Sequence, residues 1–284
     1  MAALNLPPIT PSATKIGWIG IDIMGSAMAS RLLSSGYSLT IYARTPSKAD
    51  PLIALGVHLA ASPADVAKSS DIVFTMLGHP QDVRQIILTK ETGVLSDLSS
   101  NGVVIDNTSS HPELAKEIND AARERNVVSW LSTLLEIMGS KVSFMGGLGS
   151  GQSCKIANQI MVSANLVGLS EGLVFAGKVG LDRRDWMEAV RGGAAGSMVM
   201  ELFGQRMIDR DFELGGIIEY IVKDIGMGLD FAEGLKGKGG NKDEVVVIPG
   251  ASLRKQLFVV MVANGDGKVG IQGLISVIER INGI

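Results

Sequence analysis

The sequence predicts a two-part α/β chain, with a mostly parallel sheet in its first half and an all-helical second half. Two observations support this. From residue 15 to about residue 125, short apolar strands alternate with helical segments over short connections, which is the pattern of a parallel sheet covered on both faces. From Gln152 onwards, long segments with helical spacing follow one another and no strand alternates with them.

The first strand–turn–helix unit organises the rest of the chain. Lys15–Ile19 is a predicted strand, Gly20–Gly25 a tight turn, and Ser26–Ser35 a helix that ends at Gly36. Such a unit opens a Rossmann-type dinucleotide-binding fold, because the glycines make the bend and the helix N-terminus presents free N–H groups to a pyrophosphate. The residues expected to contact the dinucleotide here are Gly20, Ile21, Asp22, Ile23, Met24 and Gly25.

The turn departs from the usual pattern at one position. Gly-x-Gly-x-x-Gly would need glycine at position 22, and Asp22 stands there. Two unit charges about 5 Å apart at an effective dielectric near 20 repel by roughly 3 kcal/mol, on the order of 100-fold in affinity. The penalty is smaller if the side chain turns to solvent, and aspartate tolerates positive φ well enough for the turn to keep its shape.

The end of the second strand carries a signal for cofactor type. Ser38–Tyr42 leads into Ala43 and Arg44. At this place an acidic residue binds the 2′-hydroxyl of NAD, whereas an arginine accommodates the 2′-phosphate of NADP. Arg44 therefore favours NADP over NAD. The alternative is a solvated turn that contains an arginine by chance.

The remaining first half continues the alternation and then breaks it. The expected strands are Asp71–Leu77 and Gly102–Asp106, and the helical or connecting segments are Pro51–Ala60, Pro63–Ser69, Gln81–Leu88 and Pro112 to about Arg125. A strand at Asn126–Ser129 then meets a helix at Trp130–Met138 with no loop between them. Lys141–Met145 is predicted as a further strand.

The second half is predicted to be helical throughout. The expected helices are Ser153–Val179, Arg183–Gly192, Met198–Ile208, Ile217–Leu235, Ala251–Val262 and Ile271–Ile281, with a glycine-rich loop at Gly237–Lys242. Asn264–Lys268 faintly resembles a calcium loop, but its twelfth position is Ile275, where a bidentate glutamate belongs, so we reject it. The predicted divisions are a tail over residues 1–14, a cofactor domain over 15–148 and a helical substrate and dimerisation domain over 149–284.

Composition excludes several classes of protein. The net charge of −3 suggests no nucleic-acid partner. The one cysteine and three scattered histidines predict neither a disulfide nor a metal site. No apolar run reaches the length needed to cross a bilayer. The first 14 residues contain no Arg or Lys, so we expect a disordered tail of a cytoplasmic protein rather than a signal or transit peptide, with an organelle left open.

Five stretches carry a family resemblance. They are Gly20–Ala29 (Gly-Ile-Asp-Ile-Met-Gly-Ser-Ala-Met-Ala), Ala43-Arg44-Thr45, Asp106–Pro112 (Asp-Asn-Thr-Ser-Ser-His-Pro), Gly149–Asn158 (Gly-Ser-Gly-Gln-Ser-Cys-Lys-Ile-Ala-Asn) and Lys223-Asp224-Ile225. In this order they resemble the motifs of the β-hydroxyacid dehydrogenases, in particular the plant-type 3-hydroxyisobutyrate dehydrogenase-like proteins. The fourth stretch matches the family pattern without change. The resemblance extends from Lys15 almost to the C-terminus.

The resemblance implies hydride transfer between NADP(H) and a small hydroxy acid or its semialdehyde, such as 3-hydroxyisobutyrate, or reduction of glyoxylate or succinic semialdehyde. It implies general acid/base catalysis by Lys155, substrate binding by Asn158, and a place near the nicotinamide and the substrate carboxylate for Lys223. It also implies a homodimer or homotetramer. The residues that it places along the cofactor are Arg44, Thr45, Met76, Leu77, Thr108, Ser109 and Lys223.

One family motif is missing. The family carries Asp-Ala-Pro-Val-Ser-Gly-Gly and a later strand ending in Gly-Gly, between positions that correspond to Asn126 and Trp130 here. Typical strand and loop lengths put the absent segment on the order of 30 residues. Its loss would expose apolar sheet edges and remove one wall of the substrate site. The alternative prediction is therefore a non-catalytic relative or splice product that acts, if at all, as a dimerising partner.

Overall fold

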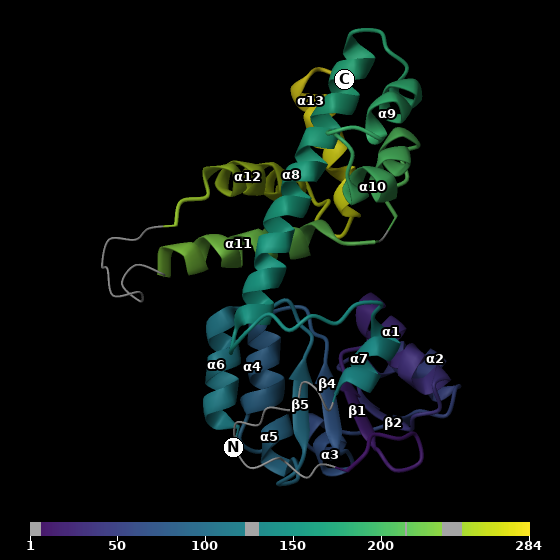
Figure 1. Cartoon of the computed structure of the whole chain (residues 1–284), viewed down its shortest axis with the longest axis vertical. Helices are drawn as coiled ribbons and strands as arrows, with labels where there is room; N and C mark the ends of the chain where they lie inside the picture. Colours follow the sequence, from purple (N-terminus) through teal and green to yellow (C-terminus); the bar gives the residue numbers. More distant parts are fainter. Residues whose placement is uncertain (1–6, 123–130, 214, 235–245) are drawn as a thin grey trace. The chain divides into compact units, whose positions relative to one another are not determined.

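The structure is a computed structural model that describes residues 7–122, 131–213, 215–234 and 246–284, and it forms two compact units, Met1–Gln152 and Ser153–Ile284 (Figure 1). The first unit contains a five-stranded parallel sheet in the order β3-β2-β1-β4-β5. The strands are β1 (Ile16–Ile19), β2 (Leu39–Tyr42), β3 (His58–Leu59), β4 (Ile72–Thr75) and β5 (Val103–Asp106). Ligands of such sheets bind where the strand order reverses, which here is beside the end of β1.

Helices cover both faces of this sheet. They are α1 (Ile23–Ser34), the 3₁₀ segment η1 (Pro46–Ala49), α2 (Asp50–Ile53), α3 (Pro63–Lys68), α4 (Pro80–Leu88), α5 (Val94–Asp97), α6 (Pro112–Ala121) and α7 (Ser132–Met138). Successive strand residues point to opposite faces, so Trp18 packs with Leu32 and Leu134 on one side, whereas Ile19 packs with Val66 on the other. The fold class predicted from sequence, a Rossmann-type sheet followed by helices, is confirmed.

One predicted strand is wrong. Residues 141–146 have no regular structure, although Lys141–Met145 is apolar enough to suggest a strand, and Phe144 is 69% exposed. A strand persists only where a neighbour completes its backbone hydrogen bonds, and this segment pairs with no strand in the described part of the chain. The strand predicted at Asn126–Ser129 and the helix start at Trp130 lie outside the described residues, and α7 is described from Ser132.

The second unit is helical, as predicted. Its helices are α8 (Ser150–Lys178), α9 (Arg183–Arg191), α10 (Met198–Ile208), α11 (Ile218–Gly234), α12 (Pro249–Ala263), the 3₁₀ segment η2 (Ile271–Leu274) and α13 (Ile275–Ile281). Leu173 of α8, Ile225 of α11 and Phe258 of α12 are fully buried in one apolar core. The loop predicted at Gly237–Lys242 lies outside the described residues.

Helix α8 corrects the expectation about bilayer-length segments. It is long and apolar enough, by length and composition, to cross a membrane. Polar residues such as Asn158 and Asn165 interrupt its apolar sequence, but its mean hydropathy is nevertheless high. Core helices of soluble proteins can be equally long and apolar, and Leu166, Leu169 and Leu173 of α8 pack inside the helical core.

A buried carboxylate ties α13 to two arginines and gives a stability prediction. Glu279 is 6% exposed, accepts a hydrogen bond from Nη1 of Arg183 at 3.2 Å and pairs with Arg210. Because charged hydrogen bonds contribute about 1.5–3 kcal/mol, Glu279→Ala is expected to lower the free energy of unfolding by about 2 kcal/mol in urea denaturation. Glu188→Ala removes an exposed partner of Arg191 and serves as the control. Equal denaturation midpoints for the two variants would contradict the prediction.

Candidate cofactor and substrate sites

The glycine turn after β1 has the close backbone approach that its sequence predicts. Gly20 has φ +95°, and a Cβ there would lie 2.1 Å from the carbonyl oxygen of Met76. A Cβ at Gly25 would lie 2.0 Å from the carbonyl oxygen of Gly20, so α1 approaches the turn as closely as backbone permits. Trp18 stabilises the turn, because its Nε1–H donates a hydrogen bond to the Gly20 carbonyl oxygen at 2.9 Å. Only glycine fits at positions 20 and 25.

Asp22 stands at the N-cap of α1 in extended conformation, with φ −70° and ψ −174°. The tolerance of aspartate for positive φ is therefore not needed, because the positive-φ position of the turn is Gly20. The Asp22 carboxylate makes no capping hydrogen bond. It accepts instead from the ammonium of Lys48 in η1, and both side chains are more than half exposed.

Arg44 lies at the end of β2 and is already paired. Its Nη1 lies 3.2 Å from Oδ1 of Asp82 in the first turn of α4, and its side chain is 84% exposed. Thr45 follows as the N-cap of η1 without a side-chain capping bond. An anion that binds Arg44 from solvent must compete with the Asp82 carboxylate.

Hydrogen bonds from the last residues of β4 and β5, and from the residues just after them, join these two strand ends. Thr75 donates its hydroxyl to Oδ1 of Asp106 at 2.8 Å, and the backbone N–H of Thr108 donates to the same oxygen at 3.0 Å. The backbone N–H of Leu77 donates to the buried Thr108 hydroxyl at 2.8 Å. Thr108 therefore positions the peptide after Met76, and Met76 in turn supplies the carbonyl that contacts Gly20.

Two buried polar atoms close in sequence to these hydrogen-bonded residues have no hydrogen-bond partner among the described residues. They are Nδ2 of Asn107 and Oγ of Ser110, and Ser110 is 2% exposed. Ser109 stands between them in sequence and is half-buried. The glycine cradle, the free N–H groups that begin α1 and these buried polar atoms fit a dinucleotide, whereas the Asp22 carboxylate opposes one unless its charge is offset.

In the second unit, α8 and α11 form a polar network around Gln159. Its Oε1 accepts from Nζ of Lys155 at 3.0 Å and from Nδ2 of Asn158 at 3.1 Å. Its Nε2 donates to Oδ2 of Asp224 at 3.0 Å. Lys223 completes the group, with Nζ 3.2 Å from Oδ1 of Asp224.

This network brings together three residues that the sequence predicts for the substrate, Lys155, Asn158 and Lys223, through two that it did not assign. Asp224 is only 3% exposed, and Gln159 joins it to the exposed Lys155. The signal for Gln159 was present, because residues four apart share a helix face. Nothing in local spacing indicates that Asp224, on another helix, faces Gln159.

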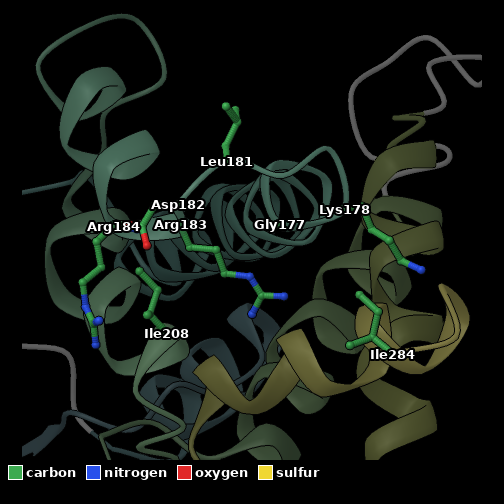
Figure 2. Close-up of a pocket in the computed structure, with 8 residues that line it drawn as sticks. All are labelled: Gly177, Lys178, Leu181, Asp182, Arg183, Arg184, Ile208 and Ile284. Atoms are coloured by element: carbon green, nitrogen blue, oxygen red, sulfur yellow. The ribbon is translucent and has the colours of Figure 1, made fainter.

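A separate pocket lies at the far end of α8 (Figure 2). Its volume is about 430 Å³, and it is lined by Gly177, Lys178, Leu181, Asp182, Arg183, Arg184, Ile208 and Ile284. A helix rises 1.5 Å per residue, so Lys178 lies roughly 35 Å along α8 from Lys155. Both arginines in this lining are paired with acids, Arg183 with Glu279 and Arg184 with Asp209. The pocket is therefore distinct from the Gln159 network.

Comparisons with known proteins define the class. The family described as the NAD binding domain of 6-phosphogluconate dehydrogenase matches residues 15–133, and the family described as NAD-binding of NADP-dependent 3-hydroxyisobutyrate dehydrogenase matches residues 149–278. The fold and these matches indicate the class of NAD(P)-binding oxidoreductases.

One relative shows which family within this class the chain belongs to. "Probable 3-hydroxyisobutyrate dehydrogenase-like 3, mitochondrial" of Arabidopsis thaliana is 48% identical and covers 97% of this chain and 91% of its own length. The chain therefore belongs to the NAD(P)-dependent β-hydroxyacid dehydrogenase family, among its 3-hydroxyisobutyrate dehydrogenase-like members. Because this relative is named mitochondrial, the cytoplasmic location expected above stays a prediction.

Solved structures share the fold. A protein named Psf3, in complex with NADP⁺, has a TM-score of 0.80, and 3-hydroxyisobutyrate dehydrogenase from Salmonella typhimurium has 0.77. Both are 20% identical and cover 93% of this chain and 99% of their own.

The alignment with the Arabidopsis relative is longer than the part of this chain that it includes. The alignment spans 305 positions and includes 97% of this 284-residue chain, or about 275 residues. About 30 aligned positions in total therefore have no residue here, and a single absent segment near Ser129–Trp130 stays a prediction.

Proposed function

We propose that the chain transfers hydride between NADP(H) and a small hydroxy acid or its semialdehyde, with 3-hydroxyisobutyrate or a close analogue as substrate. The observation that carries this proposal is the hydrogen-bonded group of Lys155, Asn158, Gln159 and Asp224, which places a lysine ammonium in a fixed polar setting. The names of the Arabidopsis and Salmonella relatives support the substrate class. A homodimer or homotetramer is part of the proposal.

The network suggests how each side chain contributes. A bound nicotinamide supplies or accepts the hydride, so the protein must give or take a proton at the substrate oxygen, and we assign this role to Lys155. A carboxylate only accepts hydrogen bonds, so Asp224 fixes the Gln159 amide with its NH₂ inward and its carbonyl toward Lys155. One N–H of the Lys155 ammonium is therefore hydrogen-bonded to Gln159, and the other two can donate to the substrate.

Two further groups complete the proposed substrate contacts. The Nδ2 of Asn158 donates a hydrogen bond to Gln159. The carbonyl oxygen of the Asn158 side chain is then left to accept from a substrate hydroxyl. Lys223 has a side chain only 12% exposed beside Asp224. Its ammonium is assigned to the substrate carboxylate.

The direct test is a fluorescence titration of the purified chain with NADPH and with NADH, followed by turnover assays on 3-hydroxyisobutyrate, glyoxylate and succinic semialdehyde. We expect micromolar NADPH binding, weaker NADH binding and turnover of at least one acid. A folded chain that binds neither dinucleotide would contradict the proposal.

Arg44 should set the preference for NADP. Arg44→Ala is expected to weaken NADPH binding about 10- to 100-fold, the equivalent of one charge-assisted hydrogen bond pair, with little effect on NADH. Asp82→Asn should tighten NADPH binding, because it releases Arg44. Arg84→Ala is the matched control, since Arg84 is also paired with an exposed acid, Glu117. Equal losses for NADPH and NADH in Arg44→Ala would show that Arg44 does not recognise the 2′-phosphate.

The alternative, a non-catalytic relative that acts as a dimerising partner, is favoured by one observation, the roughly 30 positions that this chain lacks against its Arabidopsis relative. It predicts cofactor binding without turnover on the whole acid panel. Insertion of the relative's corresponding segment at Ser129–Trp130 should then create activity. Turnover by the unmodified chain rejects this alternative.

A further inference from the structure

The ion pair between Asp22 and Lys48 joins the glycine turn itself to the segment that follows β2. Asp22 follows β1, and Lys48 lies in η1 after β2. Their side chains are 61% and 57% exposed, so the pair is open to solvent and to a ligand. An exposed pair of this kind adds little to folding stability.

The charge at the turn suggests the role of Lys48. An unpaired Asp22 carboxylate would repel a pyrophosphate and weaken binding by at most about 100-fold, and by less where solvent screens its 61% exposed side chain. The Lys48 ammonium donates a hydrogen bond to that carboxylate, so the net charge of the pair is zero. It has three N–H donors, so one can serve Asp22 while others face an incoming phosphate.

We propose that Lys48 is the counter-ion that allows the Asp22-containing turn to accept the cofactor pyrophosphate; this inference rests on the proposed function, in which the turn binds a nicotinamide dinucleotide. The two cations after β2 then have separate tasks. Arg44, held by Asp82, selects for the 2′-phosphate, and Lys48, held by Asp22, offsets the acid in the turn.

A double-mutant cycle tests this inference. NADPH and NADH are titrated, by fluorescence, into the unmodified chain, Lys48→Met, Asp22→Asn and the double variant. We expect Lys48→Met to weaken both dinucleotides by the same factor, about 10- to 100-fold, because both carry the pyrophosphate. The double variant should return to within a few-fold of the unmodified chain, because the acid that needed a counter-ion is gone. Lys68→Met, at an exposed lysine of α3, is the matched control and should change neither affinity.

Three results would overturn the inference. A loss confined to NADPH would show that Lys48 contacts the 2′-phosphate instead. A loss that Asp22→Asn does not relieve would show that the two residues act independently. Binding by Asp22→Asn but not by the unmodified chain would show that Lys48 fails to offset Asp22.

Failure of the proposed function looks different. In that case none of the four proteins binds either dinucleotide, although thermal unfolding monitored by circular dichroism shows all four folded. Equal unfolding temperatures across the set are expected in every case, because the pair is exposed.

Discussion

Lys155→Met is expected to lower kcat by about 10²- to 10⁴-fold, the usual contribution of a positioned acid or base, while NADPH affinity and thermal stability stay unchanged. Methionine keeps the length of the side chain and removes its proton. Lys155 is exposed and its described hydrogen bond is to Gln159, so the fold loses little. The readout is steady-state turnover of the acid identified in the substrate panel, with a parallel NADPH titration.

Two further variants make this result specific to proton transfer. Lys155→Arg keeps the charge but holds its proton too tightly to transfer it, so it should be nearly as slow as Lys155→Met. Lys178→Met removes a lysine from the other end of α8 and should leave kcat unchanged. A normal rate in Lys155→Met would remove Lys155 from the mechanism.

Gly20→Ala is expected to destabilise the first unit by more than about 4 kcal/mol and to abolish NADPH binding, because the new Cβ would meet backbone rather than a movable side chain. That atom would lie 2.1 Å from the Met76 carbonyl oxygen, so the chain after β1 must move away from the chain after β4. The φ of +95° adds conformational strain. Urea denaturation followed by circular dichroism, with a cofactor titration, measures both effects.

Gly56→Ala separates the two causes. Gly56 has φ +91°, nearly that of Gly20, but a Cβ there meets no atom within 4 Å. The free energy of unfolding of Gly56→Ala should therefore fall only by the strain of a left-handed alanine, about 1–2 kcal/mol. NADPH binding should be kept. If the two alanine variants unfold at the same denaturant concentration, the contact with Met76 is not what makes Gly20 necessary.

The sequence predicted well the elements whose signal is local. The strands at Ile16–Ile19 and Ile72–Thr75 are continuous apolar runs, as expected of strands buried on both faces, and the glycine turn is defined by its own residues. Lys141–Met145 has similar apolar character but forms no strand. Strand formation depends on a partner strand that can lie far along the chain. The sequence of the segment itself does not show whether such a partner exists.

The same limit applies to the sites. The family resemblance named Lys155, Asn158 and Lys223 as candidates, but it gave no sign that Asp224 meets Gln159 across 65 residues of sequence. Lys48 likewise reaches Asp22 across 26 residues. Such pairs follow from how β2 and α11 are placed in the fold, and local periodicity carries no information about that placement.

Trp18 gives the cofactor turn a natural optical probe. Its indole is fully buried, stacks on Phe74 with ring centroids 5.3 Å apart and donates to the carbonyl of the first glycine of the turn. Indole emission overlaps the absorption band of reduced nicotinamide, so a bound reduced dinucleotide should quench this tryptophan by energy transfer, whereas an oxidised one should not. With Trp130 and Trp186 replaced by phenylalanine, the emission of Trp18 alone would report occupancy of the turn before any substrate is known.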